Sequence, residues 1–276
     1  LNYYSRLFKS VFNIDGKVSK MINKNCYTLC INSTEVRNLF SLIIPDIFNY
    51  IGKSKTNVVK AFIKGFVDAE GHIDKKRPRI TIAQKEKQIL RYLQLFLLRF
   101  GIRSFLRFDV GKKKISNLSI RDRSVRDYLQ IGFTALNKQK QFLEQVNHIN
   151  NTYNKEIMPI KREDVWNLLK EVGLSPSKFI KPKSKKHLWT NRNELEKILR
   201  VLMNTQIKDR QVKQEVEFIF KILNSNISFE KIRKINIMEN KEKELLYDFS
   251  VPSNENYIAN GFVVHNSTYR MYLRRG

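Results

Sequence analysis

The sequence predicts an α+β protein in which a repeated unit of helices and β-hairpins is followed by a mainly helical segment and then by short β-strands. Three observations support this fold class. Two parts of the first half of the chain align with each other, a helical period dominates after Lys155, and alternating apolar residues return beyond residue 226.

The amino-acid composition indicates a polyanionic partner. Lys and Arg number 52 against 26 Asp and Glu, so the formal net charge of the 276 residues is +26. Such an excess opposes compact folding by self-repulsion unless DNA or RNA shares it. A soluble basic protein without such a partner stays an open alternative, whereas the scattering of basic residues along the chain disfavours an anionic membrane.

No apolar run approaches the roughly 20 residues of a membrane-spanning helix, and no secretory signal opens the sequence. Cys26 and Cys30 have no neighbouring His or Cys with which to form a zinc site, and they suit a reducing compartment. We therefore expect a cytoplasmic protein without a membrane partner.

The internal repeat organises the first half of the chain. Residues 3–14 align with 91–102, and residues 29–40 align with 118–129, so each copy is predicted to be an apolar-faced helix, a β-hairpin and a capped second helix. A further helix and strand precede only the second copy. We therefore expect the chain to be the C-terminal portion of a longer protein, cut within its first repeat.

The extra helix is predicted over residues 56–71, with Thr56 as its cap and Gly71 as a left-handed stop. Gly65 in its middle costs about 1 kcal/mol relative to Ala, which suggests that another helix approaches closely there. Asp68 and Glu70 lie at the C-terminus, where the helix dipole disfavours negative charge, so we expect a cation beside them. A solvated acidic helix end is the alternative.

The stretch "IKGFVDAEG" (residues 63–71) resembles the nine-residue motif of the LAGLIDADG homing endonucleases. The resemblance implies that family's fold, with pseudo-twofold αββαββα repeats of which the first motif helix is missing here, and two sheets that form a saddle on double-stranded DNA. By the same resemblance, Glu70 and the carbonyl of Ala69 bind Mg²⁺ at the scissile phosphate. Gln84 and Lys138 are implied to organise solvent around the nucleophile, and Asp68 to brace the helix ends.

The strand "RPRITIAQ" alternates between two isoleucines and a wet, basic side, as expected of a sheet with one core face. Residue types leave open whether that side reads bases or holds phosphates. The expected DNA-facing residues are Arg77, Arg79, Thr81, Ala83, Arg103 and Arg107.

The segment from 151 to 225 is predicted to be helical and resembles the extra DNA-binding module that archaeal inteins often carry. Its linking segment is rich in basic residues, for which a solvated loop is the alternative. These residues are Lys178, Lys181, Lys183, Lys185, Lys186 and Arg192.

The strands "SFEKIRKINIM" and "ELLYDFSVP" lead into "ENYIANGFVVHNS", and together they resemble the last two sequence blocks of an intein, the C-terminal strands of a Hint splicing domain. By this resemblance Asn266 closes its side-chain amide on its own carbonyl, His265 acts as a general acid, and Ser267 accepts the upstream acyl group. Asp248 assists proton transfer, and Glu255 stands where many inteins have His.

The final residues, 267–276, resemble a core strand of RadA-type recombinases. This resemblance implies that the host protein is such a recombinase and that residues 267–276 begin the C-extein, the part of the host that follows the intein. The predicted divisions are 1–55 and 56–150 for the two LAGLIDADG halves, 151–225 for the accessory module, and 226–266 for the splicing strands.

The sequence thus predicts the C-terminal portion of an archaeal-type intein with a DOD-type (LAGLIDADG) endonuclease, which needs its upstream segment, in cis or trans, to splice and to cut both strands. A catalytically inactive DNA- or RNA-binding module is the first alternative. A fragment of the recombinase itself is the second, and the lack of a GxxxxGK[ST] phosphate loop argues against it.

Overall fold

The structure is a computed structural model that describes residues 2–21, 26–111, 114–147, 149, 156–180, 188–225, 227–230, 232, 234–237, 239, 251 and 255–265. The chain divides into two compact units, Leu1–Phe62 and Ile63–Gly276. Among the described residues, no helix combines the length and the apolar character that a membrane span requires.

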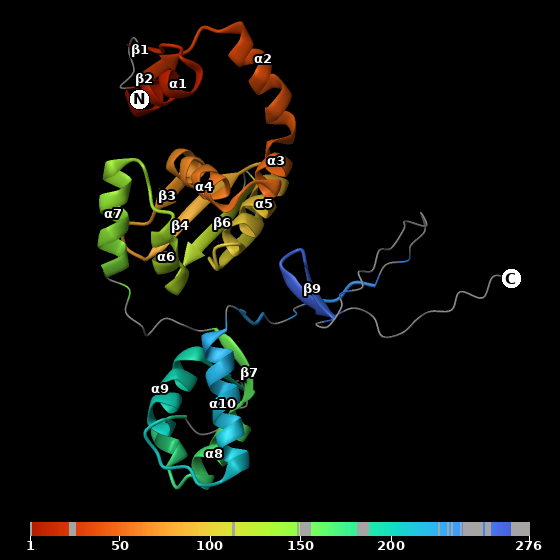
Figure 1. The fold of residues 1–276 in the computed structure, drawn as a ribbon. Helices are drawn as coiled ribbons and strands as arrows, with labels where there is room; N and C mark the ends of the chain where they lie inside the picture. The colour runs from red at the N-terminus through yellow and green to blue at the C-terminus, as the bar shows by residue number, and fades with distance from the viewer. Residues whose placement is uncertain are drawn as a thin grey trace, which may run out of the picture. The chain divides into compact units, whose positions relative to one another are not determined.

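The first unit contains the predicted helix, hairpin and helix (Figure 1). Ser33 caps the second helix by accepting a hydrogen bond from the Val36 amide, as expected of its residue type. The helix α1 contains no buried residue, so its apolar side chains remain partly open to solvent. The elements are α1 (Asn2–Phe12), β1 (Lys17–Lys20), β2 (Tyr27–Cys30), α2 (Thr34–Ile43), η1 (Ile44–Asp46) and α3 (Ile47–Lys53).

The second unit begins within α4 (Thr56–Glu70), the predicted motif helix. An antiparallel sheet follows, with the strand order β3-β4-β6-β5, which leaves β3 and β5 at its edges (Figure 1). The elements are β3 (Gly71–Ile73), β4 (Arg79–Gln84), α5 (Lys87–Leu98), β5 (Ser104–Val110), β6 (Ile115–Arg121), α6 (Arg123–Asp127), η2 (Tyr128–Gln130) and α7 (Leu136–Asn147).

One face of this sheet forms the core. The isoleucines of β4 pair in register with Leu118 and Ile120 of β6, and α5 packs on the sheet through its own buried leucines. Because side chains alternate along a strand, the opposite face keeps the polar residues. The fully buried side chains of this core include Ile80, Ile82, Leu90, Leu93, Leu97, Leu118 and Ile120.

Three expectations about the motif helix and its strand are wrong. Thr56 is the first helical residue and not a cap. Gly71 opens β3 without a positive φ, and glycine is needed there because an added Cβ would lie 2.4 Å from the Val67 carbonyl oxygen. β4 begins at Arg79, so Arg77 lies in the preceding turn. At Gly65 an added Cβ would meet no described atom within 4 Å, so the described residues do not include the expected close neighbour.

The described residues of the segment predicted to be helical form three main helices and also a two-stranded antiparallel sheet, whose strands are separated in the chain by the first of these helices. It has its own hydrophobic core, to which Met158, Leu169 and Ile198 contribute. A capping box between Asn191 and Glu194 starts the second of these helices. The elements are β7 (Ile157–Lys161), α8 (Arg162–Glu171), η4 (Pro176–Lys178), β8 (Trp189–Asn191), α9 (Arg192–Leu202) and α10 (Arg210–Asn224).

The last described element is an antiparallel hairpin of β9 (Asn256–Ala259) and β10 (Phe262–His265), which forms the predicted strands around "NG". The strand expected over residues 228–238 is wrong for its described residues, none of which is in a strand. The strand expected over 244–252 lies almost entirely outside the described residues.

Candidate functional site

The C-terminus of α4 is tied to the segment that precedes α7. Both carboxylate oxygens of Asp68 accept a hydrogen bond from the Thr134 amide, at 3.1 and 2.8 Å, and one also accepts from the Ala135 amide at 3.4 Å. A carboxylate used in this way fixes the two segments relative to each other. Asp68 therefore has the bracing geometry that the sequence predicts for it.

The cation expected at this helix end is Lys138 of α7. Its Nζ donates to the main-chain carbonyl of Asp68 at 2.6 Å and to that of Gly71 at 2.7 Å. The last carbonyls of a helix have no partner within the helix, and they carry the negative end of its dipole. Lys138 thus satisfies one of these helix carbonyls, that of Asp68, and also the first carbonyl of β3, so that it holds the main chain on both sides of Glu70.

Lys138 is the first of three α7 side chains that cover the open edge of β3. Gln141 donates to the carbonyl of Ile73 at 3.1 Å, and Gln145 donates to that of Lys75 at 3.0 Å. The acceptors at 71, 73 and 75 are alternate residues, as a strand edge requires, and the donors share one helix face. This edge ladder (Lys138, Gln141, Gln145) protects an edge strand and fixes the chain that follows Glu70.

Glu70 and Ala69 are exposed, and the Glu70 carboxylate makes no hydrogen bond or ion pair with any described residue. Nowhere in the described ranges do three metal-ligating side chains come together. One carboxylate and one carbonyl nevertheless fit Mg²⁺, which usually keeps several waters and takes further ligands from substrate phosphates. The Asp68 carboxylate is committed to backbone amides, which leaves Glu70 as the available ligand in this motif.

Gln84 ends β4, is half-buried, and pairs in register with Ser116. β3 and β4 are adjacent, with Gly71 opposite Ile82, so Gln84 lies at the same end of the sheet as Glu70. The register brings Glu70 and Gln84 to one end of the sheet, and the hydrogen bond from Lys138 to the Gly71 carbonyl places Lys138 at the same end.

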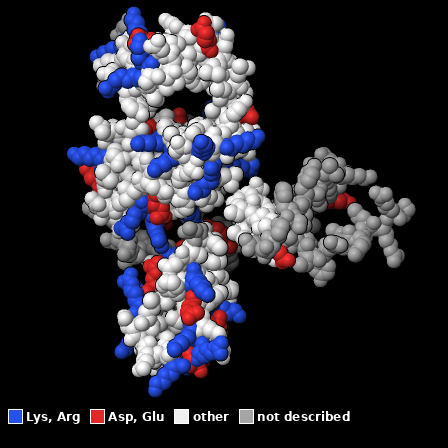
Figure 2. Space-filling view, in the orientation of Figure 1, with Lys and Arg blue, Asp and Glu red and all other residues white. Residues whose placement is uncertain are grey.

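On the polar face of the sheet, residues of adjacent strands form cross-strand pairs. Thr81 stands between His72 and Ser119, and Arg107 pairs with Asn117. Figure 2 shows Lys and Arg side chains at many separate places on the described parts of the chain, among fewer acidic groups. These features are typical of a surface that binds a polyanion.

Arg77 lies in the turn that Asp74 organises. The carboxylate of Asp74 accepts hydrogen bonds from the amides of Lys76, at 2.8 Å, and Arg77, at 3.2 Å. The Lys76 amide is the largest cause that lowers the pKa of Asp74, with smaller contributions from the Arg77 amide and from the charges of Arg79 and Arg77. The Arg77 side chain is exposed there, beyond the end of β4.

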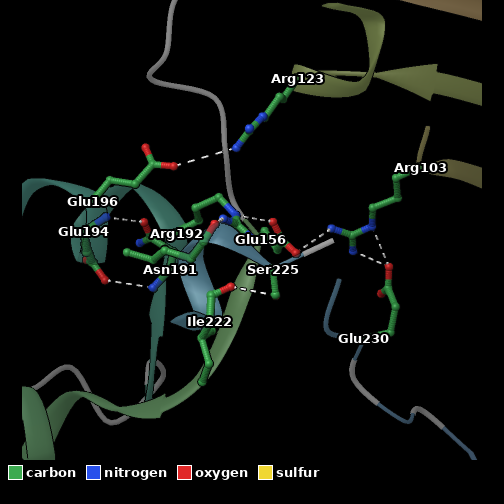
Figure 3. Close-up of polar contacts among 11 residues, drawn as sticks. Arg103, Arg123, Glu156, Asn191, Arg192, Glu194, Glu196, Ile222, Ser225 and Glu230 are labelled. Atoms are coloured by element: carbon green, nitrogen blue, oxygen red, sulfur yellow. Dashed lines mark hydrogen bonds and ion pairs between the residues drawn. The ribbon is translucent and has the colours of Figure 1, made fainter. Parts of the chain in front are cut away.

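Arg103 differs from the other expected DNA-facing residues because it is paired with acidic side chains. It donates to Glu230, and its guanidinium lies 3.8 Å from Glu156, as Figure 3 shows. Arg192, expected in an exposed basic segment, is 4% exposed and donates to Glu156 at 2.7 Å. Pairs this far apart in sequence leave no local pattern by which the sequence could have revealed them.

His265 ends β10, opposite Asn256, and its Nε2 lies 3.3 Å from the Glu255 carboxylate. Glu255 has a φ of 52°, an uncommon conformation for a residue other than glycine. Lys178 of the basic segment lies in η4 and is exposed. The remaining residues assigned to splicing and to the basic segment lie outside the described residues. These are Asp248, Asn266, Ser267, Lys181, Lys183, Lys185 and Lys186.

Comparison with known families defines the class of this protein. Residues 57–147 match the LAGLIDADG-like domain, and residues 103–266 match the intein splicing domain. The second match spans more than half of the chain, and the chain belongs to the intein splicing domain family. The fold class predicted from the sequence is thereby confirmed.

The chain is similar to parts of much longer proteins. It is 29% identical to the glutamine–fructose-6-phosphate aminotransferase of Methanocaldococcus jannaschii over 98% of this chain and 25% of that protein. It is 30% identical to the reverse gyrase of the same organism over 76% of this chain and 13% of that protein. The chain thus spans a quarter or less of these two relatives.

Two solved structures are similar to parts of the chain. The structure of I-DmoI in complex with DNA and Mn has 22% identity and a TM-score of 0.38, covering 46% of this chain and 68% of that one. Full-length DUF199/WhiA from Thermatoga maritima has 13% identity and a TM-score of 0.34, covering 79% and 75%.

Proposed function

We propose that this chain is the C-terminal portion of an intein whose LAGLIDADG-like part is a metal-dependent, site-specific DNA endonuclease. The observation that carries the proposal is the end of α4. There an exposed carboxylate, Glu70, follows a braced helix end and stands beside the polar face of a sheet in a protein with a net charge of +26.

Glu70 and the Ala69 carbonyl would hold Mg²⁺, which when bound lowers the pKa of a water and neutralises charge on the phosphate. Lys138 keeps the main chain on both sides of Glu70 in place through its two carbonyl contacts. Gln84, at the same end of the sheet, can orient a water through its amide. The polar sheet face holds the DNA so that a phosphate reaches this end.

The hairpin of β9 and β10 would serve the second activity, the asparagine-cyclisation half of protein splicing. Nucleophilic attack by the side-chain amide nitrogen of Asn266 on its own carbonyl carbon releases the following residue as an amine. His265 would give a proton to that leaving nitrogen, and the Glu255 carboxylate at 3.3 Å would orient its ring. Ser267 would accept the upstream acyl group, and Asp248 would assist proton transfer.

The relatives support the proposal that the segment is inserted into a host protein. An aminotransferase and a reverse gyrase have unrelated names, yet each contains a stretch similar to most of this chain. The finer proposals are an archaeal origin, a RadA-type recombinase as host, a DOD-type endonuclease, a cytoplasmic location, double-stranded DNA as substrate and Mg²⁺ as the metal. The upstream intein segment would be needed for both activities.

Two experiments test this function in the full-length gene product. Mass spectrometry of the product from cells should find a ligated host protein that lacks this segment, and retention of the segment would contradict splicing. For the nuclease, duplexes selected from a random pool by binding without metal should be cut once Mg²⁺ is added.

The second candidate is a nucleic-acid-binding module without catalysis, which the polar sheet face and the net charge of +26 would serve equally well. Such a module would retain the selected duplexes but would leave them uncut in Mg²⁺.

A further inference from the structure

Two arginines of the polar sheet face stand directly opposite each other. Arg79 of β4 pairs in register with Arg121 of β6, one position beyond the buried pair of Ile80 and Ile120. Like charges directly opposite each other on adjacent strands are destabilising. This arrangement needs a compensating negative charge.

The described part of the chain does not supply that charge in direct contact. Neither Arg79 nor Arg121 makes an ion pair with a described residue, and the Nε atom of each is buried without a hydrogen-bond partner there. Asp74 is close enough to Arg79 for its pKa to be affected, yet its oxygens accept the Lys76 and Arg77 amides. The two positive charges thus lack a compensating ion pair among the described residues, so an anion that reaches the terminal guanidinium nitrogens would stabilise this pair.

Phe105 orients one of the two guanidinium groups. The Cζ atom of Arg121 lies 3.7 Å from the centre of the Phe105 ring, and that of Arg103 lies 5.1 Å from the same centre. Stacking covers the face of a guanidinium but leaves its edge N–H groups free to donate. Arg103 uses its edge for Glu230, whereas Arg121 has no such carboxylate among the described residues.

The cavity of about 660 Å³ beside the Phe105 stack is a separate feature, because its lining includes Arg121 and the carboxylates of Asp122, Asp127 and Glu156 but not Arg79. The guanidinium fork matches the paired oxygens of a phosphate group, which carries enough oxygens to accept hydrogen bonds from two forks at once.

We propose that Arg79 and Arg121 together bind one backbone phosphate of a nucleic acid, and that Phe105 fixes the plane of the Arg121 guanidinium. This phosphate clamp (Arg79, Arg121, Phe105) rests on the proposed function for the identity of the polyanion. Glu70 immediately precedes Gly71, and Gly71 pairs with Ile82 near one end of β4. Arg79 is the first residue of β4, so the phosphate clamp lies toward the opposite end of that strand. At about 3.3 Å per residue the clamp and Glu70 are separated by on the order of 10–15 Å, so the phosphate bound by the clamp is not the scissile one.

The test uses the full-length protein, an unrelated DNA duplex and inorganic phosphate as probes. The double variant Arg79→Gln/Arg121→Gln should lower the magnitude of the slope of log K against log salt by about 0.9, the value of one phosphate contact on duplex DNA, and each single variant should lower it by part of that amount. Arg121→Lys should keep the slope because the positive charge is retained. It should weaken binding, because an ammonium group neither stacks on Phe105 as a plane nor donates two parallel hydrogen bonds to a phosphate. Arg91→Gln is the matched control, since Arg91 also stacks on a phenylalanine, Phe108, at 5.4 Å.

Thermal unfolding separates this role from a structural one. Without ligand, Arg121→Gln should melt at or above the wild-type temperature because a like-charge repulsion is removed. Inorganic phosphate should raise the melting temperature of wild type by more than that of the variant. An unchanged salt slope, or a clearly lower melting temperature with an unchanged phosphate effect, would overturn the clamp.

Failure of the proposed function gives a different result. If the wild-type protein binds no duplex, the DNA assignment fails, while the difference in phosphate-dependent melting between wild type and Arg121→Gln still decides whether the clamp binds phosphate.

Discussion

The Nζ atom of Lys138 lies 2.6 Å from the main-chain carbonyl oxygen of Asp68, from which it is separated by 70 positions in sequence. The same ammonium reaches the carbonyl of Gly71. One cation therefore holds the main chain before and after Glu70, which couples the stability of α4 to the position of the proposed metal ligand.

Lys138→Met should lower both stability and cleavage. Two partly buried carbonyls lose their donor, which we expect to cost about 1–3 kcal/mol of the free energy of unfolding, measured by urea denaturation. Lys138→Gln is the informative companion because its amide can still donate to one carbonyl. A Gln variant with near-native stability and slow cleavage would support a role in solvent organisation, whereas native cleavage rates would show that Lys138 acts only as a cap.

The edge ladder predicts a second stability effect. Gln145→Leu should destabilise the protein by about 1 kcal/mol because the Lys75 carbonyl loses its donor from α7. Lys140→Ala on the same helix is the control, since Lys140 is exposed and outside the ladder. Equal urea midpoints for wild type and Gln145→Leu would show that the ladder adds no stability.

Removal of the Tyr128 hydroxyl, unlike the loss of Gln145, should not lower the stability of the protein. Its hydroxyl is buried without a hydrogen-bond partner among the described residues, and burial, with a smaller effect of the Asp68 charge, raises the pKa of this phenol far above its usual value. Tyr128→Phe should therefore leave stability unchanged or raise it by up to about 1 kcal/mol.

The pH dependence of this variant follows from the same shift. The unfolded chain releases the phenol proton near pH 10 while the folded chain keeps it, so the contribution of Tyr128 to stability is complete below about pH 10 and declines above it. Urea denaturation between pH 8 and 11 should show wild type losing stability faster than Tyr128→Phe. Parallel curves would contradict the burial of this hydroxyl.

The contact between Glu255 and His265 leads us to expect that a change at Glu255 affects splicing. Glu255→Gln should slow cleavage after Asn266 by roughly two- to fivefold, since the contact of the Glu255 carboxylate with His265 is half-exposed and such contacts contribute about 1 kcal/mol or less. The rate of release of the C-terminal product, followed by mass spectrometry of the full-length protein, measures this. A rate that stays at the wild-type value would show that the contact with His265 has no role in the step.

Much of the fold could be predicted because its periodicities are local. The apolar stripe of α4 and the alternation of β4 follow directly from residue order. Arg77 was misplaced because the carboxylate of Asp74 organises a turn where alternation alone suggested a strand. The clamp residue Arg121 could have been found from the alternation of Asn117, Ser119 and Arg121 in β6.

Contacts between distant segments could not be predicted. The pairing of Arg103 with Glu230 and of Asp68 with the Thr134 amide depends on how the elements pack, and no spacing in the sequence encodes it. The same holds for the partners of Lys138. Its residue type suggested a role near the helix end, but the two carbonyls that it contacts follow only from the position of α7 beside β3 (Figure 1).

The most direct test of the nuclease site compares wild type with Glu70→Gln in the full-length protein, on a duplex selected by binding without metal. Both should bind that duplex equally well in the absence of metal, and with Mg²⁺ the variant should cut at least about 100-fold more slowly, because the carboxylate ligand is lost. Equal cutting rates for the two proteins would contradict the assignment of Glu70.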